Sequence, residues 1–253
     1  MDNRLAATVP FSLHGSSSDD CGAENNCVTC PGRSDSVLDG VPDHLTCRFR
    51  SRDYDRGEVL FQQGDAAREI YCLGEGFVKI ERRDATGKRT VIGLGKTGDL
   101  LGADFLMGST VYPETVIALG SVRACKMPAE VFRQQIRESP ELSLNLINYL
   151  HRRLNESRIM FCRLSRNNNR SKIADVLLTL AEFFGEEQAD GILIRAWLSR
   201  DDMASLAGTV KESFIRHLKE FKEEGILETQ RRNICVANIK KLEEIAQRDR
   251  LIF

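Results

Sequence analysis

The most regular hydrophobic pattern of the chain lies in its last quarter, between residues 198 and 227. A short run of apolar residues at helical spacing follows Ser199, and Asp202 three positions later completes a capping box, so a helix is predicted to begin here. Gly208 then permits a left-handed turn, and Thr209 can cap a second helix. The second helix is predicted to bury one apolar stripe, formed by Val210, Phe214, Leu218 and Phe221.

The opposite side of this second helix is mostly charged. It is formed by Lys211, Glu212, Ile215, Arg216 and Lys219. Gly225 ends the helix, and the run 226–238 is typical of a two-stranded hairpin. Two helices, a tight turn and a following hairpin are the order of a winged helix-turn-helix, which docks its second helix in the major groove of DNA. A plain helical hairpin packed in a core is the alternative, but it does not explain the hairpin or the outward basic residues.

Between about residue 54 and Pro128 the pattern changes to short apolar runs of β type. Glycines at 57, 64, 76, 87 and 98 separate these runs, and the segment DATGK at 84–88 is typical of a hairpin turn. Short strands with regular turn signals predict a sandwich or a jelly-roll barrel.

A long helix is predicted from Ser139, Pro140 and Glu141, which supply a cap, a proline at the first helical position and an acid at the positive end of the helix dipole. Two heptad seams then follow, one formed by Ile147, Leu154 and Phe161 and the other by Leu150, the polar Ser157 and Leu164. The residues outside the seams are strongly polar, which favours an exposed helix that meets a partner. We therefore expect a homodimer; the alternative is a core helix packed on its own barrel.

Composition limits the remaining possibilities. The net charge is −1, so any positive surface that attracts DNA has to be local. No apolar run reaches the roughly 18 residues of a membrane helix, and the N-terminus lacks a signal region, so we expect a cytoplasmic protein without a membrane partner. No nucleophile–base pair, P-loop or HExxH motif supports catalysis, so we expect no enzyme activity.

The expected fold is α+β in four parts. They are a flexible cysteine-containing tail at 1–40, a β-roll sensor domain at 41–137, a dimerisation helix at 138–168 and a winged helix-turn-helix at 169–253.

Four segments together resemble the CRP/FNR superfamily of bacterial transcription regulators. They are GEVLFQQGD at 57–65, LGEGFVKI at 73–80, GDLLGADFL at 98–106 and GTVKESFIRHLKEFKEEGIL at 208–227. The resemblance implies an N-terminal β-roll of the cyclic-nucleotide-binding type, a dimerisation helix and a C-terminal winged helix. It also implies a homodimer that reads a two-fold symmetric operator in double-stranded DNA, with RNA polymerase as a partner.

The resemblance further implies which residues read DNA. Glu212, Ile215 and Arg216 stand where the family contacts bases; Arg can bind guanine O6 and N7, Glu can accept from cytosine N4, and Ile215 can meet a thymine methyl. The FNR-type pattern has Ser where Ile215 stands, so the half-site is expected to differ. Phosphate contacts are expected from Thr209, Lys211, Lys219, Arg231 and Arg232.

The same resemblance argues against cyclic AMP as the signal. Members that bind it carry a glutamate after the first glycine of the phosphate segment and an Arg-Ser pair further on. Here Ala103 takes the place of the glutamate, and no arginine occurs between Arg89 and Arg123. A buried phosphate would therefore lack a cationic partner.

Three cysteines lie in the polar N-terminal segment, where they cannot be core residues: Cys21, Cys27 and Cys30. FNR-type oxygen sensors place three cysteines in this segment and a fourth after the β-roll, where Cys125 stands. The resemblance therefore implies an iron–sulfur cluster of the 4Fe–4S type, labile to oxygen or nitric oxide. The order of the gaps between the cysteines departs from FNR, because the two-residue gap here follows the five-residue gap. Cys47 is an alternative ligand.

Other sensing chemistries stay open. Cys21, Cys27, Cys30 and Cys47 can form a four-thiolate zinc site, although only one CxxC pair is present. A thiol–disulfide switch, or a small ligand or haem in the β-roll, are the further alternatives. Cys72, Cys162 and Cys235 lie within apolar patterns and are predicted to be buried packing residues.

Overall fold

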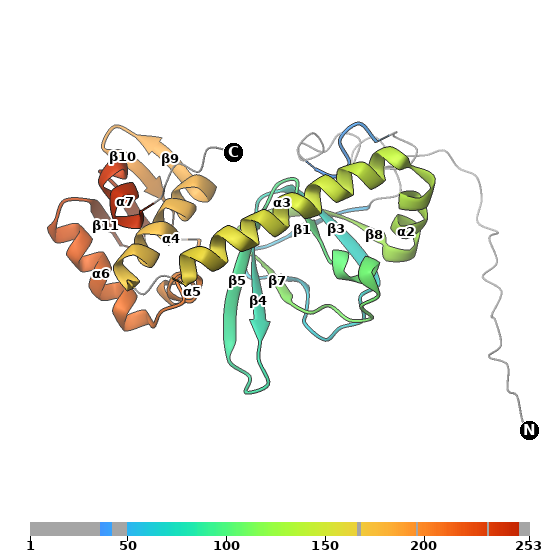
Figure 1. Cartoon of the computed structure of the whole chain (residues 1–253), viewed down its shortest axis with the longest axis horizontal. Coiled ribbons are helices and arrows are strands. Elements are labelled where there is room, and N and C mark those ends of the chain that lie inside the picture. Colours follow the sequence, from blue (N-terminus) through green and yellow to red (C-terminus); the bar gives the residue numbers. More distant parts are fainter. Residues whose placement is uncertain (1–35, 42–49, 166–167, 196, 232, 248–253) are drawn as a thin grey trace, which may run out of the picture.

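The computed structural model describes residues 36–41, 50–165, 168–195, 197–231 and 233–247. Figure 1 shows a β-sheet unit and a smaller, mainly helical unit that are joined by one long helix, α3 (Pro140–Leu164). Within the described residues, no helix combines the length and apolar character needed to cross a membrane. The architecture is the α+β fold that the sequence predicts.

The N-terminal unit is built from two antiparallel four-stranded sheets. The first has the order β1 (Arg50–Tyr54), β8 (Val122–Pro128), β3 (Glu69–Glu75) and β6 (Leu100–Leu101). The second has the order β2 (Val59–Phe61), β7 (Thr115–Ala118), β4 (Phe77–Arg83) and β5 (Arg89–Lys96). Inward residues of both sheets, including Leu73, Val78 and Val116, form one buried core. The predicted β-roll is confirmed.

A second core lies on the outer face of the first sheet. Alternation along β3 and β8 turns Ile70, Cys72, Cys125 and Met127 outward, where α2 (Ala129–Glu138) and the first half of α3 cover them. The segment 36–41 completes this layer. The Asn145 amide on α3 holds that segment by donating to the carbonyl oxygens of Val37 at 3.3 Å and Asp39 at 2.8 Å.

The C-terminal unit combines four helices with a small antiparallel sheet of order β11-β12-β10-β9. Its elements are α4 (Asn169–Phe184), β9 (Gly185–Gln188), β10 (Gly191–Ile194), α5 (Arg200–Leu206), α6 (Lys211–Glu223), β11 (Leu227–Gln230), β12 (Asn233–Val236) and α7 (Ile239–Ala246). The predicted hairpin is β11–β12. Together α5, the turn, α6 and this hairpin form the predicted winged helix-turn-helix.

The ends of α5 and α6 test the local predictions. The capping box is present: the Ser199 hydroxyl accepts from the Asp202 amide at 3.0 Å, and the Asp202 carboxylate accepts from the Ser199 amide at 3.2 Å. Gly208 adopts the expected left-handed turn, with φ of 59°. Thr209 does not cap α6, because the helix begins one residue later, at an extended Val210 that makes no side-chain cap hydrogen bond. The extended backbone also takes Val210 out of the buried stripe, and its side chain is 64% exposed.

The two units are packed against each other along the second sheet. Val91, Leu94 and Leu119 of the β-roll belong to the same buried core as the winged helix. The Val91 amide donates to the Ser205 hydroxyl at 2.8 Å, which ties β5 to α5. Phe77 meets Phe184 edge to face, with 4.7 Å between ring centroids. Packing as well as the long helix therefore sets the orientation of the winged helix.

A buried ion cluster lies at the same joint. The Lys79 ammonium on β4 is 3.1 Å from a carboxylate oxygen of Asp202 and 2.7 Å from one of Glu81. Asp202 also belongs to the capping box, so one carboxylate serves both the start of α5 and the contact between the units.

Candidate DNA interface, dimer seam and sensor site

The outward side of α6 carries the three predicted base-reading residues and two of the predicted phosphate contacts. Lys211, Glu212, Ile215, Arg216 and Lys219 are all exposed. On the opposite side, three residues of the predicted stripe are buried and hold the helix in place: Phe214, Leu218 and Phe221. The charged side of the helix is therefore open to a partner while its apolar side is fixed.

The C-terminal half of α6 is anchored to α4 through Arg170. Its guanidinium donates to both carboxylate oxygens of Glu224, at 2.6 and 2.7 Å, and lies over the ring of Phe221 at 4.7 Å. Both hydrogen bonds come from Nη2, and with the cation–π contact they hold the guanidinium in position. The recognition helix is thus a rigid element of its unit.

Charges on the open side of α6 are only weakly engaged within the chain. Glu212 makes no ion pair with any described residue, and Arg216 pairs with Glu220 instead. The two side chains therefore do not form the i,i+4 ion pair that a helix side facing only solvent could carry. Arg216 is 67% exposed and lies 3.9 Å from Glu220, an exposed contact of the kind that contributes little. His217 differs, because its side chain is only 12% exposed and faces Glu220 at 3.2 Å.

Two of the remaining predicted phosphate contacts, Thr209 and Arg231, are among the described residues. Thr209 is half-buried in the turn between α5 and α6, where its amide donates to the Ala204 carbonyl at 3.0 Å. Arg231 is exposed at the tip of the β11–β12 hairpin, in a left-handed conformation with φ of 55°. Arg232 lies outside the described residues.

The long helix α3 has two different apolar faces. Leu142, Leu146 and Tyr149 are buried against the chain's own β-roll. Most of the predicted seam points elsewhere and is exposed: Ile147 at 60%, Leu150 at 37%, Leu154 at 49% and Phe161 at 72%. Packing on the barrel therefore accounts for only one face of the helix.

The two ends of the seam depart from the prediction. Leu144 is 61% exposed and extends the outward apolar side toward the start of α3, a position that heptad counting from residue 147 misses. At the other end, Leu164 is half-buried and leans on the turn at Gly208. Ser157 is exposed, and its hydroxyl donates to the Arg153 carbonyl at 2.9 Å.

The segment after β6 contains the 3-10 helix η2 (Ala103–Met107) and carries acidic rather than basic side chains. Burial, with the nearby Asp104 carboxylate, raises the pKa of Glu114, whereas Arg153 and Arg82 act in the opposite direction. The arginines that act on Glu114 therefore come from α3 and from β4, not from the segment itself.

The cysteines fall into three groups. Cys72 and Cys125 are directly opposite each other on β3 and β8, and they are 1% and 2% exposed. Cys235 is buried as predicted, and burial raises the pKa of its thiol. The prediction for Cys162 is wrong: it is exposed, because it lies on α3 beyond the part that the β-roll covers.

The predicted tail ligands Cys21, Cys27 and Cys30, and the alternative Cys47, lie outside the described residues. Within the described part of the chain no group of three or more His, Cys, Asp or Glu side chains could hold a metal ion. Cys30 precedes Ser36 by six residues, which an extended chain spans in about 20 Å at most. Val37 and Leu38 pack in the same buried core as Cys125.

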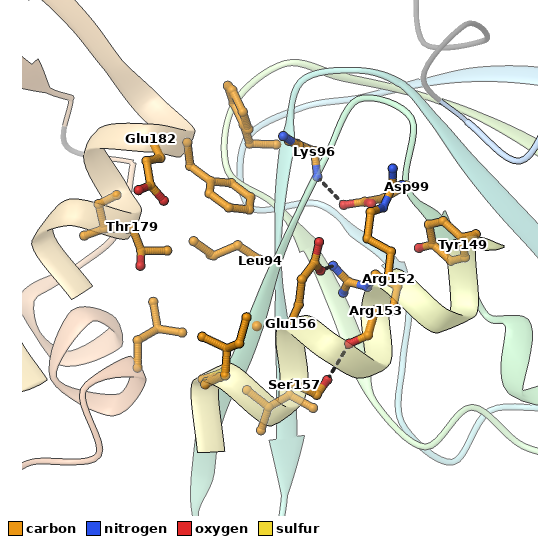
Figure 2. Close-up of a pocket in the computed structure, with 18 of the residues that line it drawn as sticks. Leu94, Lys96, Asp99, Tyr149, Arg152, Arg153, Glu156, Ser157, Thr179 and Glu182 are labelled. Atoms are coloured by element: carbon orange, nitrogen blue, oxygen red, sulfur yellow. Dashed lines mark hydrogen bonds and ion pairs between the residues drawn. The ribbon is translucent and has the colours of Figure 1, made fainter. Parts of the chain in front are cut away.

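A cleft of about 1250 Å³ lies between β5, α3 and α4. Figure 2 shows Leu94, Lys96 and Asp99 on the β-roll side, with Arg152, Arg153 and Glu156 projecting from α3. Most charges here already have partners: Arg153 is 3.1 Å from Glu156, and the Asp99 carboxylate accepts from the Lys96 amide at 2.8 Å. The cleft touches both units and the helix that joins them.

The geometry defines a DNA-binding protein with a β-roll sensor unit and a C-terminal winged helix. Two family models match the same parts of the chain: a cyclic nucleotide-binding domain at residues 51–139 and a Crp-like helix-turn-helix domain at residues 171–245. The chain is a DNA-binding transcription regulator of the CRP/FNR type, a group of regulators rather than enzymes.

Similar proteins agree with this class. The chain is 24% identical over 198 residues to the CRP-like cAMP-activated global transcriptional regulator of Mycobacterium tuberculosis, covering 78% of this chain and 88% of the relative. It is 24% identical over 227 residues to the fumarate and nitrate reduction regulatory protein of Vibrio cholerae, covering 90% and 89%. A CRP-family regulator from Thermus thermophilus has the same fold, with a TM-score of 0.69, 22% identity and coverage of 78% and 96%.

Proposed function

We propose that this chain acts as a homodimer that reads a two-fold symmetric operator and senses oxygen, nitric oxide or redox state through a cysteine-ligated iron–sulfur cluster. The observation that carries the DNA part is the open, charged side of α6 opposite a fully buried apolar side. RNA polymerase is the expected partner of the DNA-bound dimer.

Reading of the operator is assigned to the first half of α6. Arg216 binds a guanine through O6 and N7, Glu212 accepts from a cytosine N4, and Ile215 meets a thymine methyl. Neither Glu212 nor Arg216 has to break a strong internal ion pair to do so. Phosphate contacts from Thr209, Lys211, Lys219, Arg231 and Arg232 set the register.

Dimerisation is assigned to the outward face of α3. Its exposed apolar residues would be costly in a monomer, and a second α3 supplies the same surface by two-fold symmetry. Pairing through Ile147, Leu150, Leu154, Ser157, Phe161 and Leu164 would present both α6 helices on one side of the dimer, as successive major grooves about 34 Å apart require.

The iron–sulfur cluster is assigned to Cys21, Cys27, Cys30 and Cys125, with Cys47 as the alternative ligand. The donor set fits in kind, since thiolates are the usual ligands of such clusters, and Val37 and Leu38 of segment 36–41 pack in the same core as Cys125. When bound, the cluster supplies thiolate-held iron whose oxidation is the signal. The protein's part is to hold segment 36–41 on α3 through Asn145, so that a change at Cys125 alters packing on the dimer helix.

Cyclic AMP does not suit this β-roll. In other members of the family, the segment after β6 binds the phosphate of cyclic AMP. In this chain it carries Asp104 and Glu114, and the Glu114 carboxyl group is poorly solvated because it is largely buried. A phosphate would add a further negative charge beside them.

Anaerobic purification with a visible spectrum, iron and sulfide assays, and air exposure tests the sensor. A brown protein with roughly equal iron and sulfide that bleaches in air is expected, with iron lost in Cys125→Ala and retained in the matched control Cys235→Ala. Colourless, iron-free protein would refute the cluster. DNA affinity that survives Arg216→Ala would refute the reading of α6.

A small organic ligand in the cleft of Figure 2 is the second candidate, favoured by the cleft's size and by its contact with both units and α3. Signal-dependent DNA binding that persists after Cys27→Ser and Cys30→Ser would favour it over the cluster.

A further inference from the structure

Val210 is the most exposed large hydrophobic residue of the described winged helix. Among the described residues from 168 to 247, the large hydrophobic side chains that are exposed are those of Val210, at 64%, and Ile215, at 47%. Val210 is the N-cap residue of α6 and Ile215 lies in the first half of that helix, so both are at the end of α6 that the proposed function places in the major groove. An isolated exposed valine needs no explanation, but two apolar side chains placed only among the predicted base-reading residues do.

Val210 also differs from most cap residues of the described helices, since only α2, which follows Pro128, likewise starts without a side-chain cap hydrogen bond. The helices α3, α4, α5 and α7 each begin with a side chain that accepts a backbone hydrogen bond, namely Ser139, Asn168, Ser199 and Asn238. Val210 occupies this position in α6 and makes no such bond. A serine or threonine there would stabilise the helix start, so valine is a poor choice for folding alone.

The turn before α6 fixes where Val210 lies. The Gly208 amide donates to the Ser205 carbonyl and the Thr209 amide to the Ala204 carbonyl, both at 3.0 Å. The Phe214 amide then donates to the Val210 carbonyl at 3.1 Å, which closes the first turn of the helix. Backbone hydrogen bonds on both sides therefore fix the position of Val210, and the residue is left 64% exposed.

We infer that Val210 is a specificity-determining residue that packs against the C5-methyl group of a thymine in the operator, in addition to the thymine contacted by Ile215. This methyl is the one apolar group that base edges present in the major groove. N-terminal residues of a recognition helix contact base edges directly, and contact with a methyl removes apolar surface of both partners from water. The inference rests on the proposed insertion of α6 into the major groove.

A uracil scan tests this inference on the intact protein. The probe is the duplex most enriched from a random library by the wild-type protein, resynthesised with single thymines replaced symmetrically by uracil, which removes only the methyl. Affinities are measured for wild type, Val210→Ser and Ile215→Ser. Val111→Ser is the matched control, since Val111 is 43% exposed but lies in the β-roll. Serine at 210 can also cap α6, so Val210→Ser is expected to stay folded in a thermal melt monitored by circular dichroism.

Two methyl-sensitive positions per half-site are expected for wild type, each losing about fourfold in affinity per methyl, or about sixteenfold for both half-sites together. Val210→Ser should bind the thymine and uracil duplexes equally at one position and keep its sensitivity at the other, with the reverse for Ile215→Ser. If Val210→Ser keeps both sensitivities while Arg216→Ala loses binding, the inference fails and the proposed reading of α6 stands. If Arg216→Ala binds as wild type, or no duplex is enriched, both fail.

Discussion

Gly120→Ala is expected to loosen the joint between the β-roll and the winged helix. Gly120 lies between β7 and β8, and an added Cβ would overlap Cζ3 of Trp197 and lie 2.9 Å from its Cη2. Its φ is not in the left-handed region, so alanine brings no backbone strain of its own. The indole ring has to retreat by about 1 Å to restore a normal van der Waals separation.

The cost follows from overpacking. Forcing one extra methyl group into a packed contact typically costs about 1–3 kcal/mol, and the rigid indole has no flexible end that can yield. Gly93→Ala is the matched control, because its Cβ would meet the Ile80 side chain at an ordinary 3.8 Å. We expect the control to change the free energy of unfolding by less than about 1 kcal/mol.

A double-mutant cycle isolates the contact. In a Trp197→Ala background the ring is absent, so Gly120→Ala should cost almost nothing further, giving a coupling energy of about 1–3 kcal/mol. Urea unfolding followed by circular dichroism measures all four proteins. Trp197 is the chain's single tryptophan, so a red shift of its fluorescence in Gly120→Ala would report the ring's move toward water. An equal cost in both backgrounds, or a cost no larger than that of Gly93→Ala, would refute the reasoning.

Three further outcomes are expected. Leu154→Glu puts a charge in the exposed seam of α3 and should turn the dimer into a monomer in light scattering; an unchanged mass would contradict the seam. Ser199→Ala removes the acceptor for the Asp202 amide and should cost about 1 kcal/mol in urea unfolding, whereas Ser199→Asp should not. Because burial raises the pKa of Glu114, the folded state holds that proton more tightly, and wild-type stability should fall relative to Glu114→Gln as pH rises above about 4.5. A stability difference that does not vary with pH would exclude this.

Sequence patterns predicted the elements that carry their own local signal. The short β-type runs between residues 54 and 128 became β2, β3, β4, β5, β7 and β8, because each is a short apolar segment bounded by turn residues. The strands β1 and β9 were missed for the opposite reason. In β1 only Tyr54 is buried, and every residue of β9 is exposed, so neither strand shows alternation.

Periodicity also failed where it could not tell which surface is covered. Cys162 fits an apolar pattern on α3, yet the β-roll does not extend to that part of the helix. Val210 fits the stripe of α6 by count, but the helix begins after it. The placement of Cys72 opposite Cys125, and of Trp197 on Gly120, depends on strand pairing and on contact between distant segments, which no local pattern encodes.

The core that the β-roll and the winged helix share also determines whether the two units can be separated. The two family models divide the chain at the long helix, but the buried clusters do not, since Val91, Leu94 and Leu119 of the β-roll complete the core of the winged helix. Residues that share one core tend to unfold cooperatively. A winged helix cut out at residue 169 would expose Phe184 and Trp197, and a chimera with another sensor would need the same edge of β4 and β5. We therefore expect the cooperative unfolding unit of this chain to be larger than its DNA-binding unit.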